Sequence, residues 1–325
     1  MRISIVGAGW VGCHLASRLR SRHQVDLYDS GGIFSGSSMT NQNRLHLGFH
    51  YARNSHTREM CRETFERFRS DYGEVLSHVD GNVYAVPERD SLLDLSTYMS
   101  IFDHERYSYE LCCVPELVDV EGALIVPEMR IDAQRAKSMF EEELSDLLRI
   151  TRVDDALVGQ ISDGSDLVIN CTNNLFRPIT DRTFYEVAVM LKYNRKRQTS
   201  FGALTMVDGR LFSIFPCYDG SFTLSSVEYT PVAVFESVGD LAGFSAASMD
   251  ERSMRLSFES LVLKFYPGFY SDFDYCGVVT SVKAKTRSES SDRSPVVRVD
   301  GNVVSCFTGK IQGIYRIEDR IRGML

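Results

Sequence analysis

Several features that mark other protein classes are missing from this chain of 325 residues. No apolar run approaches the roughly 20 residues that cross a bilayer, which argues against a membrane protein. The eight cysteines include no C-x-x-C pair, which argues against a zinc site or a disulfide framework and favours reduced thiols. Lys and Arg total 36 against 44 Asp and Glu, so a general nucleic-acid binder is not expected.

Common catalytic motifs are absent as well. The sequence has no G-x-S-x-G elbow and no Walker loop, which removes the usual hydrolase and NTPase interpretations. No spacing of His, Cys and Asp suggests a metal site. The first strand-like run, at 3–6, begins two residues after Met1 and leaves no room for a signal peptide, so we expect a cytoplasmic protein.

The N-terminal pattern predicts an α/β fold. A short apolar strand at 3–6 leads through glycines into a helix at 13–20, and a second strand follows at 25–29. A further helix is predicted over 133–147, with Asp132 as its N-cap. This order is typical of a βαβ nucleotide-binding domain.

The middle of the chain has a different character. Residues 185–275 are dominated by strand-like alternation, with Asp-Gly hairpin signals at 208–209 and 219–220. We therefore predict a nucleotide-binding domain that is discontinuous in sequence and an inserted substrate domain. The nucleotide-binding domain comprises 1–80, 120–180 and 275–325, and the substrate domain comprises 81–119 and 181–274.

A glycine motif, G-x-G-x-x-G, follows the first strand at Gly7, Gly9 and Gly12. The first glycine permits a tight turn, the second lets the backbone approach a pyrophosphate, and the third lets helix and strand pack closely. The helix N-terminus offers N–H groups to the anion. Asp29 ends the second strand, where its carboxylate favours ribose hydroxyls over a 2′-phosphate. The motif leaves NAD and FAD open, and its plain alternative is a glycine turn without a ligand.

The segment after the second strand distinguishes these cofactors. Instead of continuing into a third strand, the chain carries the pattern Asn-x-x-x-x-His-x-Gly-x-x-Tyr at Asn41, His46, Gly48 and Tyr51. This pattern resembles the segment that the D-amino-acid oxidase (DAO) superfamily places along its flavin. It is most similar to the 2-hydroxyglutarate oxidase branch.

The resemblance continues beyond this segment. Residues 122–144 look like the family's return into its FAD domain, and 166–172 look like a strand that usually ends in Ala-Thr-Gly or Ala-Gly. Asn173 and Asn174 replace that final glycine, and the family's usual Gly-His-Gly is absent from 308–313. The match therefore covers the N-terminal half well and the end of the chain only in architecture.

The resemblance implies a Rossmann-like FAD-binding domain of the glutathione-reductase type, with an inserted, mostly antiparallel β substrate domain. It implies FAD as the cofactor, with a helix start near Gly309 that can stabilise negative charge on the reduced flavin. The residues expected at the cofactor are Gly7, Gly9, Trp10, Val11, Gly12, Asp29, Ser37, Ser38, Asn43, Val153, Thr172, Gly309, Lys310 and Ile311.

The implied activity is oxidation of a small molecule, with removal of hydride from a C–N or CH–OH centre and transfer of electrons to oxygen or another acceptor. We assign His46, Tyr51 and Arg44 to the catalytic site. An imidazole with a pKa near the usual ~6.5 could act as the base, although His46 could also attach the flavin covalently or only bond the loop backbone. Further candidates for substrate contact are His50, Tyr218, Tyr229, Arg287 and Arg293.

Three other functions stay open from the sequence. A flavin-dependent, non-redox sugar mutase and an NAD(P)H-using monooxygenase would share the glycine motif. A non-catalytic nucleotide-binding relative would explain Asn173, Asn174 and the altered tail. The tail, together with residues 288–293, also resembles FAD oxidoreductases associated with bacterial glycan or secondary-metabolite gene sets, and this resemblance implies a role in such biosynthesis. We expect no metal, nucleic-acid or membrane partner.

Overall fold

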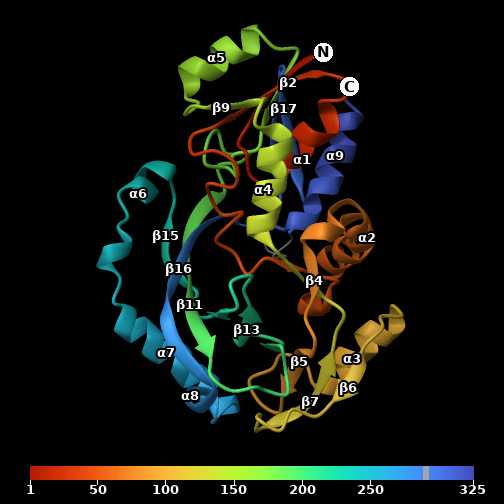
Figure 1. Cartoon of the computed structure of the whole chain (residues 1–325), viewed down its shortest axis with the longest axis vertical. Coiled ribbons are helices and arrows are strands. Elements are labelled where there is room, and N and C mark those ends of the chain that lie inside the picture. The colour runs from red at the N-terminus through yellow and green to blue at the C-terminus, as the bar shows by residue number, and fades with distance from the viewer. Residues whose placement is uncertain (288–292) are drawn as a thin grey trace.

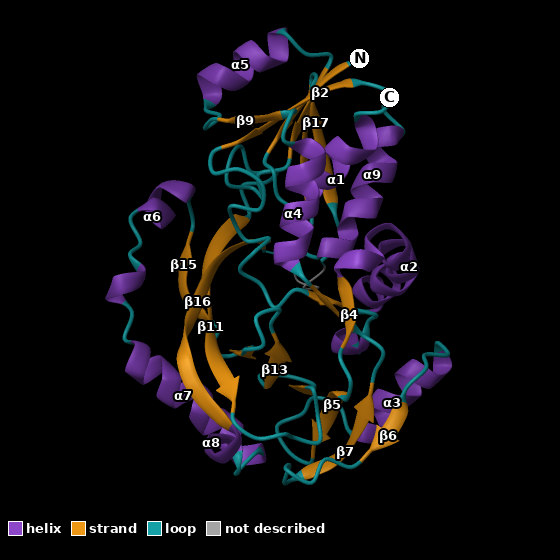
Figure 2. Cartoon of the chain, in the orientation of Figure 1, coloured by secondary structure: helices purple, strands orange, loops and turns teal. Residues whose placement is uncertain are grey.

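The structure is a computed structural model that describes residues 1–287 and 293–325. It contains two large β-sheets, of six and nine strands. The six-stranded sheet lies at the end of the molecule that holds both termini, and the nine-stranded sheet lies at the opposite end (Figure 1). Helices flank both sheets, and long loops cross between them (Figure 2).

The six-stranded sheet is parallel except at one edge. Its strands, in spatial order, are β17 (Val296–Asp300), β18 (Val303–Phe307), β10 (Leu167–Asn170), β1 (Arg2–Val6), β2 (Gln24–Asp29) and β9 (Leu148–Ile150). Only β17 runs antiparallel to its neighbour. Ile5 lies opposite Leu27 on one side and Ile169 on the other, and all three are fully buried, as expected for a parallel sheet covered on both faces.

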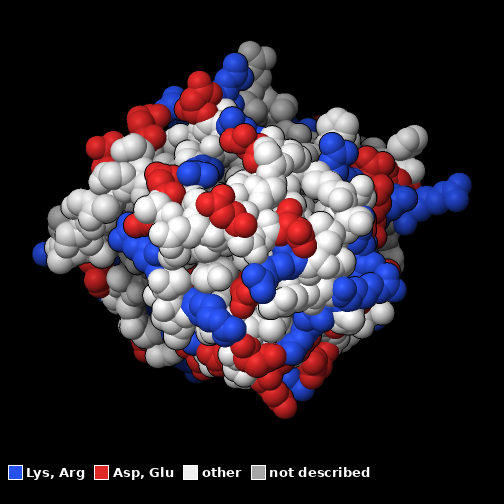
Figure 3. All heavy atoms as spheres, turned by 90° about the horizontal axis from the view of Figure 1, so that it is seen from above, with Lys and Arg blue, Asp and Glu red and all other residues white. Residues whose placement is uncertain are grey.

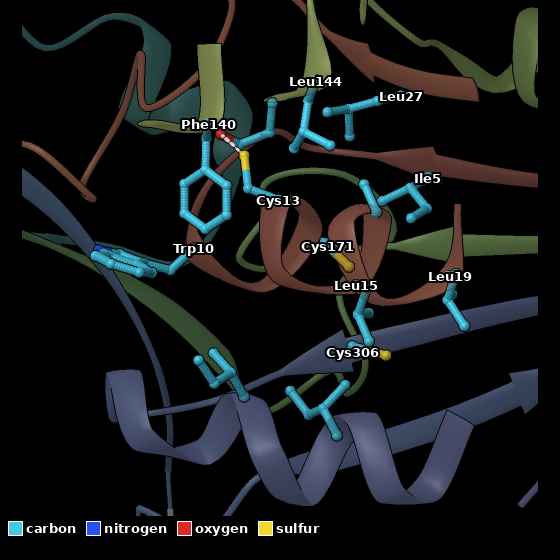
Figure 4. Packing of buried hydrophobic residues seen from close by; sticks show 14 of the residues in the cluster. Ile5, Trp10, Cys13, Leu15, Leu19, Leu27, Phe140, Leu144, Cys171 and Cys306 are labelled. Atoms are coloured by element: carbon cyan, nitrogen blue, oxygen red, sulfur yellow. Dashed lines mark hydrogen bonds between the residues drawn. The ribbon is translucent and has the colours of Figure 1, made fainter. Parts of the chain in front are cut away.

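Helices pack around this sheet and build an apolar core (Figure 4). They are α1 (Trp10–Leu19), α2 (Ser55–Tyr72), α4 (Ala133–Leu144), α5 (Asp155–Asp163) and α9 (Ile314–Arg322). Asp132 caps α4 as predicted, because its side chain accepts a hydrogen bond from the Arg135 amide. The ring of Trp10 lies 4.9–5.6 Å, centroid to centroid, from four aromatic rings. These rings fix the start of α1 and belong to Phe34, Phe68, Tyr72 and Phe140.

The nine-stranded sheet is antiparallel except where β5 pairs with β12. Its strands are β15 (Pro231–Phe235), β11 (Thr183–Arg195), β14 (Phe222–Ser226), β13 (Phe212–Pro216), β12 (Ala203–Met206), β5 (Asn82–Pro87), β7 (Val120–Ile125) and β6 (Glu110–Cys112), with β16 (Phe273–Thr286) paired to β11. The hairpins predicted at 208–209 and 219–220 are confirmed, because β13 pairs with both β12 and β14. Further helices are α3 (Leu95–His104), α6 (Val238–Ala242), α7 (Glu251–Phe265) and α8 (Phe269–Asp272).

A small third sheet lies between the large ones (Figure 1). It consists of β3 (Arg44–Leu45), β8 (Met129–Ile131) and β4 (Leu76–His78). Single turns of 3-10 helix occur at η1 (Phe49–Tyr51), η2 (Gly73–Val75), η3 (Ala246–Ser248) and η4 (Ile311–Gly313).

The structure corrects two of the predicted boundaries. Strands β7 and β16, which we expected in the nucleotide-binding domain, belong to the nine-stranded sheet. β7 pairs with β5, and β16 pairs along the whole length of β11. The boundaries expected at 120 and 275 therefore move to the ends of these strands. The rest of the division into domains stays a prediction.

The surface carries charges of both signs. Acidic and basic side chains are intermixed over the face that Figure 3 shows, without a single basic field. Within the described ranges, every helix is too short or too polar to cross a membrane.

A buried carboxylate–histidine pair fastens α9 to α1 and α2. The carboxylate of Glu318 lies 3.0 Å from His14 Nε2, and the Tyr72 hydroxyl lies 2.6 Å from the other ring nitrogen. Arg67 and Arg322 also donate to Glu318. The ring nitrogens of His14 and the carboxylate oxygens of Glu318 thus all have hydrogen-bond partners inside the core.

Helix α1 packs closely against the turn after β1. A Cβ at Gly12 would lie 1.8 Å from the carbonyl oxygen of Gly7, which no side chain tolerates. Gly7 itself has φ +102°, and a Cβ there would lie 2.7 Å from the Cys171 carbonyl oxygen. These two glycines let the helix N-terminus approach the carboxyl ends of β1 and β10.

We expect Gly12→Ala to destabilise the protein by about 3 kcal/mol, because α1 must move away from the backbone at Gly7. Thermal unfolding followed by circular dichroism measures the effect. Gly159→Ala is the matched control, since open space surrounds Gly159 within α5, and this change should stabilise by about 0.5–1 kcal/mol. Equal unfolding temperatures for the two variants would contradict the assigned contact.

Candidate functional site

A cavity of about 1530 Å³ is lined by residues from both large sheets. Its walls include the turn after β1, the segment 35–42, the segment 308–311 and strands β11 and β16. Pockets for one small ligand usually measure roughly 300–1,000 Å³. This cavity is therefore large enough for a nucleotide cofactor and a substrate together.

One end of the cavity is built to receive a phosphate group. Gly7 and Gly9 line it, and a Cβ at Gly9 would come within 3.1 Å of Ser38 Oγ. Helix α1 begins there with Gly9 as its N-cap, which has no side chain to accept from the first N–H groups of the helix. The Ser38 hydroxyl accepts a hydrogen bond from the Trp10 amide and joins the 35–38 segment to this turn. Bare glycine backbone at a helix N-terminus suits a pyrophosphate.

Asp29 has a second task that the sequence did not indicate. Its Oδ2 accepts from the Ala8 amide at 2.8 Å, and its Oδ1 accepts from Gly31, Gly32 and Ser35. The carboxylate thus fixes the glycine turn and the following loop while it also lines the cavity.

Most residues predicted at the cofactor do line the cavity. They are Gly7, Gly9, Trp10, Val11, Asp29, Ser37, Ser38, Val153, Thr172, Gly309, Lys310 and Ile311. Gly12 does not line it, because its role is the close packing of α1 on Gly7. Asn43 does not either, because its carbonyl accepts the Ile131 amide at 2.7 Å.

The turn after β10 explains the missing glycine of the family pattern. Asn173 and Asn174 have φ of 56° and 61°, which is the left-handed region where glycine is favoured and asparagine is tolerated. The turn therefore keeps the glycine-like conformation, with Thr172 and Asn173 on the cavity wall. Together with the bare glycines at α1, this wall fits FAD.

The other end of the cavity gathers aromatic and imidazole rings. His46 follows β3, and His50 and Tyr51 lie in η1. The three ring centroids lie 5.3–5.6 Å from one another. The Nζ of Lys310, from the start of η4, lies 4.6 Å from the centre of the Tyr51 ring. The structure thus brings together His46, Tyr51 and His50, which we assigned to catalysis and substrate contact, and Lys310, which we expected at the cofactor.

A residue that sequence analysis missed lies directly behind His46. The carboxylate of Glu128 is buried, and its Oε2 lies 3.2 Å from His46 Nδ1. Oε1 accepts from the amides of Leu47 and Gly48, at 2.8 and 3.1 Å. Tyr84 donates its hydroxyl to Oε2 at 2.7 Å. No local pattern marks Glu128, since a single glutamate before a short strand usually lies at the surface.

Arg44 is placed differently from the prediction that it grips the substrate. Its guanidinium is buried and donates to Tyr84, Thr205 and Ser213 at 2.7–2.9 Å. It also lies 4.0 Å from the centre of the Phe215 ring. Arg44 borders the cavity, but these bonds commit its terminal nitrogens to the protein. The guanidinium therefore stabilises the cavity wall and does not bind a ligand through its terminal nitrogens.

The pKa values of the two histidines are lowered. Burial and the positive charge of Lys310 lower the pKa of His46 to about 4, although Glu128 opposes this shift. Burial, His46 and Lys310 also bring the pKa of His50 well below its usual value. Both imidazoles are therefore neutral at neutral pH. The expectation that His46 keeps a pKa near 6.5 is wrong, because the ring is removed from water.

Three cations face the cavity. Lys283 of β16, Arg293 and Lys310 line it, and the part of the chain that the structure describes offers none of them an ion-pair partner. Burial, with the charges of Arg293 and Lys283, lowers the pKa of Lys310 to about 7. Burial also lowers the pKa of Lys283. Half-buried cations that have no carboxylate partner among the described residues indicate a site for an anion.

Three predicted substrate contacts lie away from the cavity. Tyr218 is 47% exposed in the turn between β13 and β14. Tyr229 lies in the turn after β14 and packs 5.9 Å from the Phe258 ring. Arg287 donates to Glu236 at the surface. The two tyrosines were expected on strands of the substrate domain, and Arg287 was predicted from residue type. The turns and the ion pair direct these side chains elsewhere.

Other cavity residues were not predicted. Lys283 was hidden in a strand pattern that indicated only β structure. Arg53 and Asp208, which line the cavity, form an ion pair with each other although they are 155 residues apart in the sequence. A sequence signal exists only for the segment around Arg53, which follows the family-like pattern ending at Tyr51.

The comparisons with known proteins agree with this geometry. Residues 2–313 match the family described as "FAD dependent oxidoreductase", or DAO. The chain is 33% identical to the FAD-dependent monooxygenase FPY4 of Fusarium mangiferae, over 99% of this chain and 90% of that protein. It is 27% identical to the FAD-dependent monooxygenase kojA of Aspergillus flavus, over 99% and 85%.

Solved structures show the same fold. Glycine oxidase from Geobacillus kaustophilus superposes with a TM-score of 0.73 at 11% identity, covering 99% of this chain and 94% of that one. L-α-glycerophosphate oxidase from Mycoplasma pneumoniae superposes with a TM-score of 0.71 at 12% identity, covering 98% and 92%. The predicted fold class and cofactor are confirmed, whereas these relatives do not single out the 2-hydroxyglutarate oxidase branch. The chain belongs to the DAO family, and it is an FAD-dependent oxidoreductase.

Proposed function

We propose that this enzyme oxidises a CH–OH or C–N centre of a small anionic molecule. The observation that carries the proposal is one cavity wall on which the neutral His46 ring lies near Lys310, a cation without an ion-pair partner among the described residues. The ring can accept a proton, and the cation can hold a carboxylate or phosphate beside it. The acceptor of the electrons is oxygen or another oxidant.

The proposal assigns a separate role to each part of the cavity wall. The glycine turn and the N-terminus of α1 bind the pyrophosphate of FAD, and Asp29 keeps that turn in place. FAD, when bound, supplies the hydride acceptor. His46 takes the proton from the substrate hydroxyl or amine. Lys310 and Arg293 orient the anionic group, while the Tyr51 ring closes the wall under Lys310.

A second candidate function is supported by the names of the relatives. The Fusarium mangiferae and Aspergillus flavus relatives, which match along nearly the whole chain, are named FAD-dependent monooxygenases. Such an enzyme would oxidise NAD(P)H and insert oxygen into its substrate. Consumption of pyridine nucleotide that depends on the substrate would favour this function over direct oxidation of the substrate.

The deciding experiment starts from the absorption spectrum of the purified protein. We expect a yellow protein whose flavin is bleached anaerobically by a member of a panel of 2-hydroxy acids and D- and L-amino acids. Bleaching by NADPH and not by the panel would overturn direct oxidation in favour of the monooxygenase. A colourless protein that takes up no FAD would contradict the assigned cofactor site.

Gly9→Val tests the cofactor site. The added side chain would occupy the space within 3.1 Å of Ser38 Oγ where the pyrophosphate must approach, so we expect the variant to lose flavin. The ratio of flavin absorbance to protein absorbance measures the loss. Gly159→Val is the control, because it adds the same side chain in open space on α5. Full flavin content in Gly9→Val would show that the site is misplaced.

His46→Ala tests the proton acceptor. The variant should keep FAD but be reduced at least about 10²-fold more slowly by the panel compound that bleaches the wild type, since a general base contributes about 10²–10⁴-fold. Anaerobic stopped-flow absorbance gives the rate. The control is His56→Ala, which removes an exposed imidazole at the start of α2. An unchanged rate would reduce His46 to a structural residue, and loss of flavin would indicate attachment or support.

The pH profile tests both titrating groups. Because the base must be neutral, kcat/KM should rise with pH through about 4, the pKa of His46. Lys310 loses its charge above about pH 7, so kcat/KM for a 2-hydroxy acid, which stays anionic, should fall as pH rises through 7.

In Lys310→Met, kcat/KM should no longer fall as the pH rises through 7. The KM at low pH should rise by about 10–100-fold, since a hydrogen bond to a charged group contributes about 1.5–3 kcal/mol. Lys264→Met, on the exposed side of α7, is the control. An alkaline decline that persists in Lys310→Met would assign that titration to another group.

A further inference from the structure

We propose that Glu128 is the positioning residue of His46 and holds the hydrogen of the imidazole on Nδ1, so that Nε2 is the proton acceptor. The inference deepens the proposed function by stating which atom of His46 works and what orients it. Glu128 does not line the cavity, so it acts through the histidine and not on the substrate.

Among the described residues, the three groups other than His46 that hydrogen-bond to the Glu128 carboxylate are all donors. The amides of Leu47 and Gly48 donate to Oε1, and the Tyr84 hydroxyl donates to Oε2. His46 Nδ1 lies 3.2 Å from the same Oε2. A carboxylate that receives donors on both oxygens is held in its ionised form, which has no hydrogen to give.

The charge on Glu128 is stabilised although the group is buried. Burial by itself would raise its pKa, but the His46 and Arg44 interactions and the Tyr84 hydroxyl hold that pKa well below its usual range. Arg44 reaches the carboxylate through Tyr84, whose oxygen accepts from Arg44 at 2.9 Å. A neutral His46 facing this anion has one favourable arrangement, in which Nδ1–H donates.

The arrangement leaves Nε2 as the second nitrogen of a ring that lines the cavity. The structure gives it no hydrogen-bond partner among the described residues. The backbone that carries the ring is fixed at both ends, because Gln312 donates to the His46 carbonyl and Glu128 receives the next two amides. Gly48 allows this turn with φ +135°, where a Cβ would lie 2.8 Å from Tyr107 Oη.

Glu128→Gln separates positioning from simple structural support. Only the amide oxygen can accept from Leu47 and Gly48, so it must take the place of Oε1. The NH₂ group then takes the place of Oε2 and donates to His46 Nδ1. The hydrogen must move to Nε2, which turns the proton acceptor into a donor. Shape and volume are unchanged.

The readout is the tautomer of His46, observed by nitrogen NMR of the FAD-loaded protein labelled in histidine. The chain has seven histidines, and the signal that disappears in His46→Gln identifies the ring. We expect Nδ1 to be protonated in the wild type and Nε2 to be protonated in Glu128→Gln. An Nε2–H tautomer in the wild type, or the same tautomer in both proteins, would overturn the inference.

The matched control is Glu318→Gln. It replaces another buried carboxylate that contacts a histidine, His14 at 3.0 Å, with the same amide. Glu318→Gln should leave the tautomer of His46 unchanged. If Glu128→Gln does not fold, Tyr84→Phe is the alternative variant, because it removes one donor from Oε2 and keeps the carboxylate. We expect His46 to keep its hydrogen on Nδ1 in Tyr84→Phe. Loss of that tautomer would contradict the inference that the carboxylate of Glu128 sets it.

The reduction rate distinguishes this inference from the proposed function. If His46 is the base, Glu128→Gln should slow bleaching by the active panel compound about 10²–10⁴-fold, with KM changed less than kcat. A changed tautomer with an unchanged rate in both Glu128→Gln and His46→Ala would refute the proposed base, yet it would support positioning by Glu128. A slowed rate with an unchanged tautomer would refute the positioning.

Discussion

The buried carboxylate of Glu128 is the interaction on which the catalytic wall depends. It joins the segment after β3 to β5 through Tyr84, and Arg44 extends the network to β12 and β13. A buried charge costs several kcal/mol in desolvation unless donors compensate it, and removal of one partner leaves the rest unpaired. Because each oxygen of Glu128 has two hydrogen-bond partners, the wall has one favourable arrangement, with His46 facing the cavity.

The parts of the structure that the sequence predicted are those set by local chemistry. Gly7, Gly9 and Gly12 act within one turn of chain, and Asp132 caps the helix that it precedes. The Asp-Gly pairs mark hairpins for the same reason, because a tight turn needs particular residues at neighbouring positions. The family-like segment placed His46 and Tyr51 at the cavity, since its spacing lies within a dozen residues.

The parts that the sequence did not predict depend on contacts between distant residues. Glu128 lies 82 residues from His46, and nothing near it in the sequence shows that it is buried. The expectation for Arg44 was wrong because its partners come from three other strands. The boundaries at β7 and β16 were misplaced because strand pairing, rather than strand propensity, decides which sheet a segment joins. An expected strand placed Tyr218, and residue type placed Arg287, in a site from which a turn and an ion pair remove them.

The cavity and the whole molecule differ in their electrostatics. The chain carries a net charge of −8. The cavity, in contrast, is faced by Lys283, Arg293 and Lys310, which have no carboxylate partner among the described residues. The buried anion Glu128 lies behind the wall and is stabilised by hydrogen-bond donors. Burial, with the charges of Arg293 and Lys283, lowers the pKa of Lys310 to about 7. An anion bound beside Lys310 would stabilise its charged form and raise that pKa again. Binding of an anion near neutral pH would therefore take up a proton, so by linkage the affinity of this cavity for anions should decrease as the pH rises through 7.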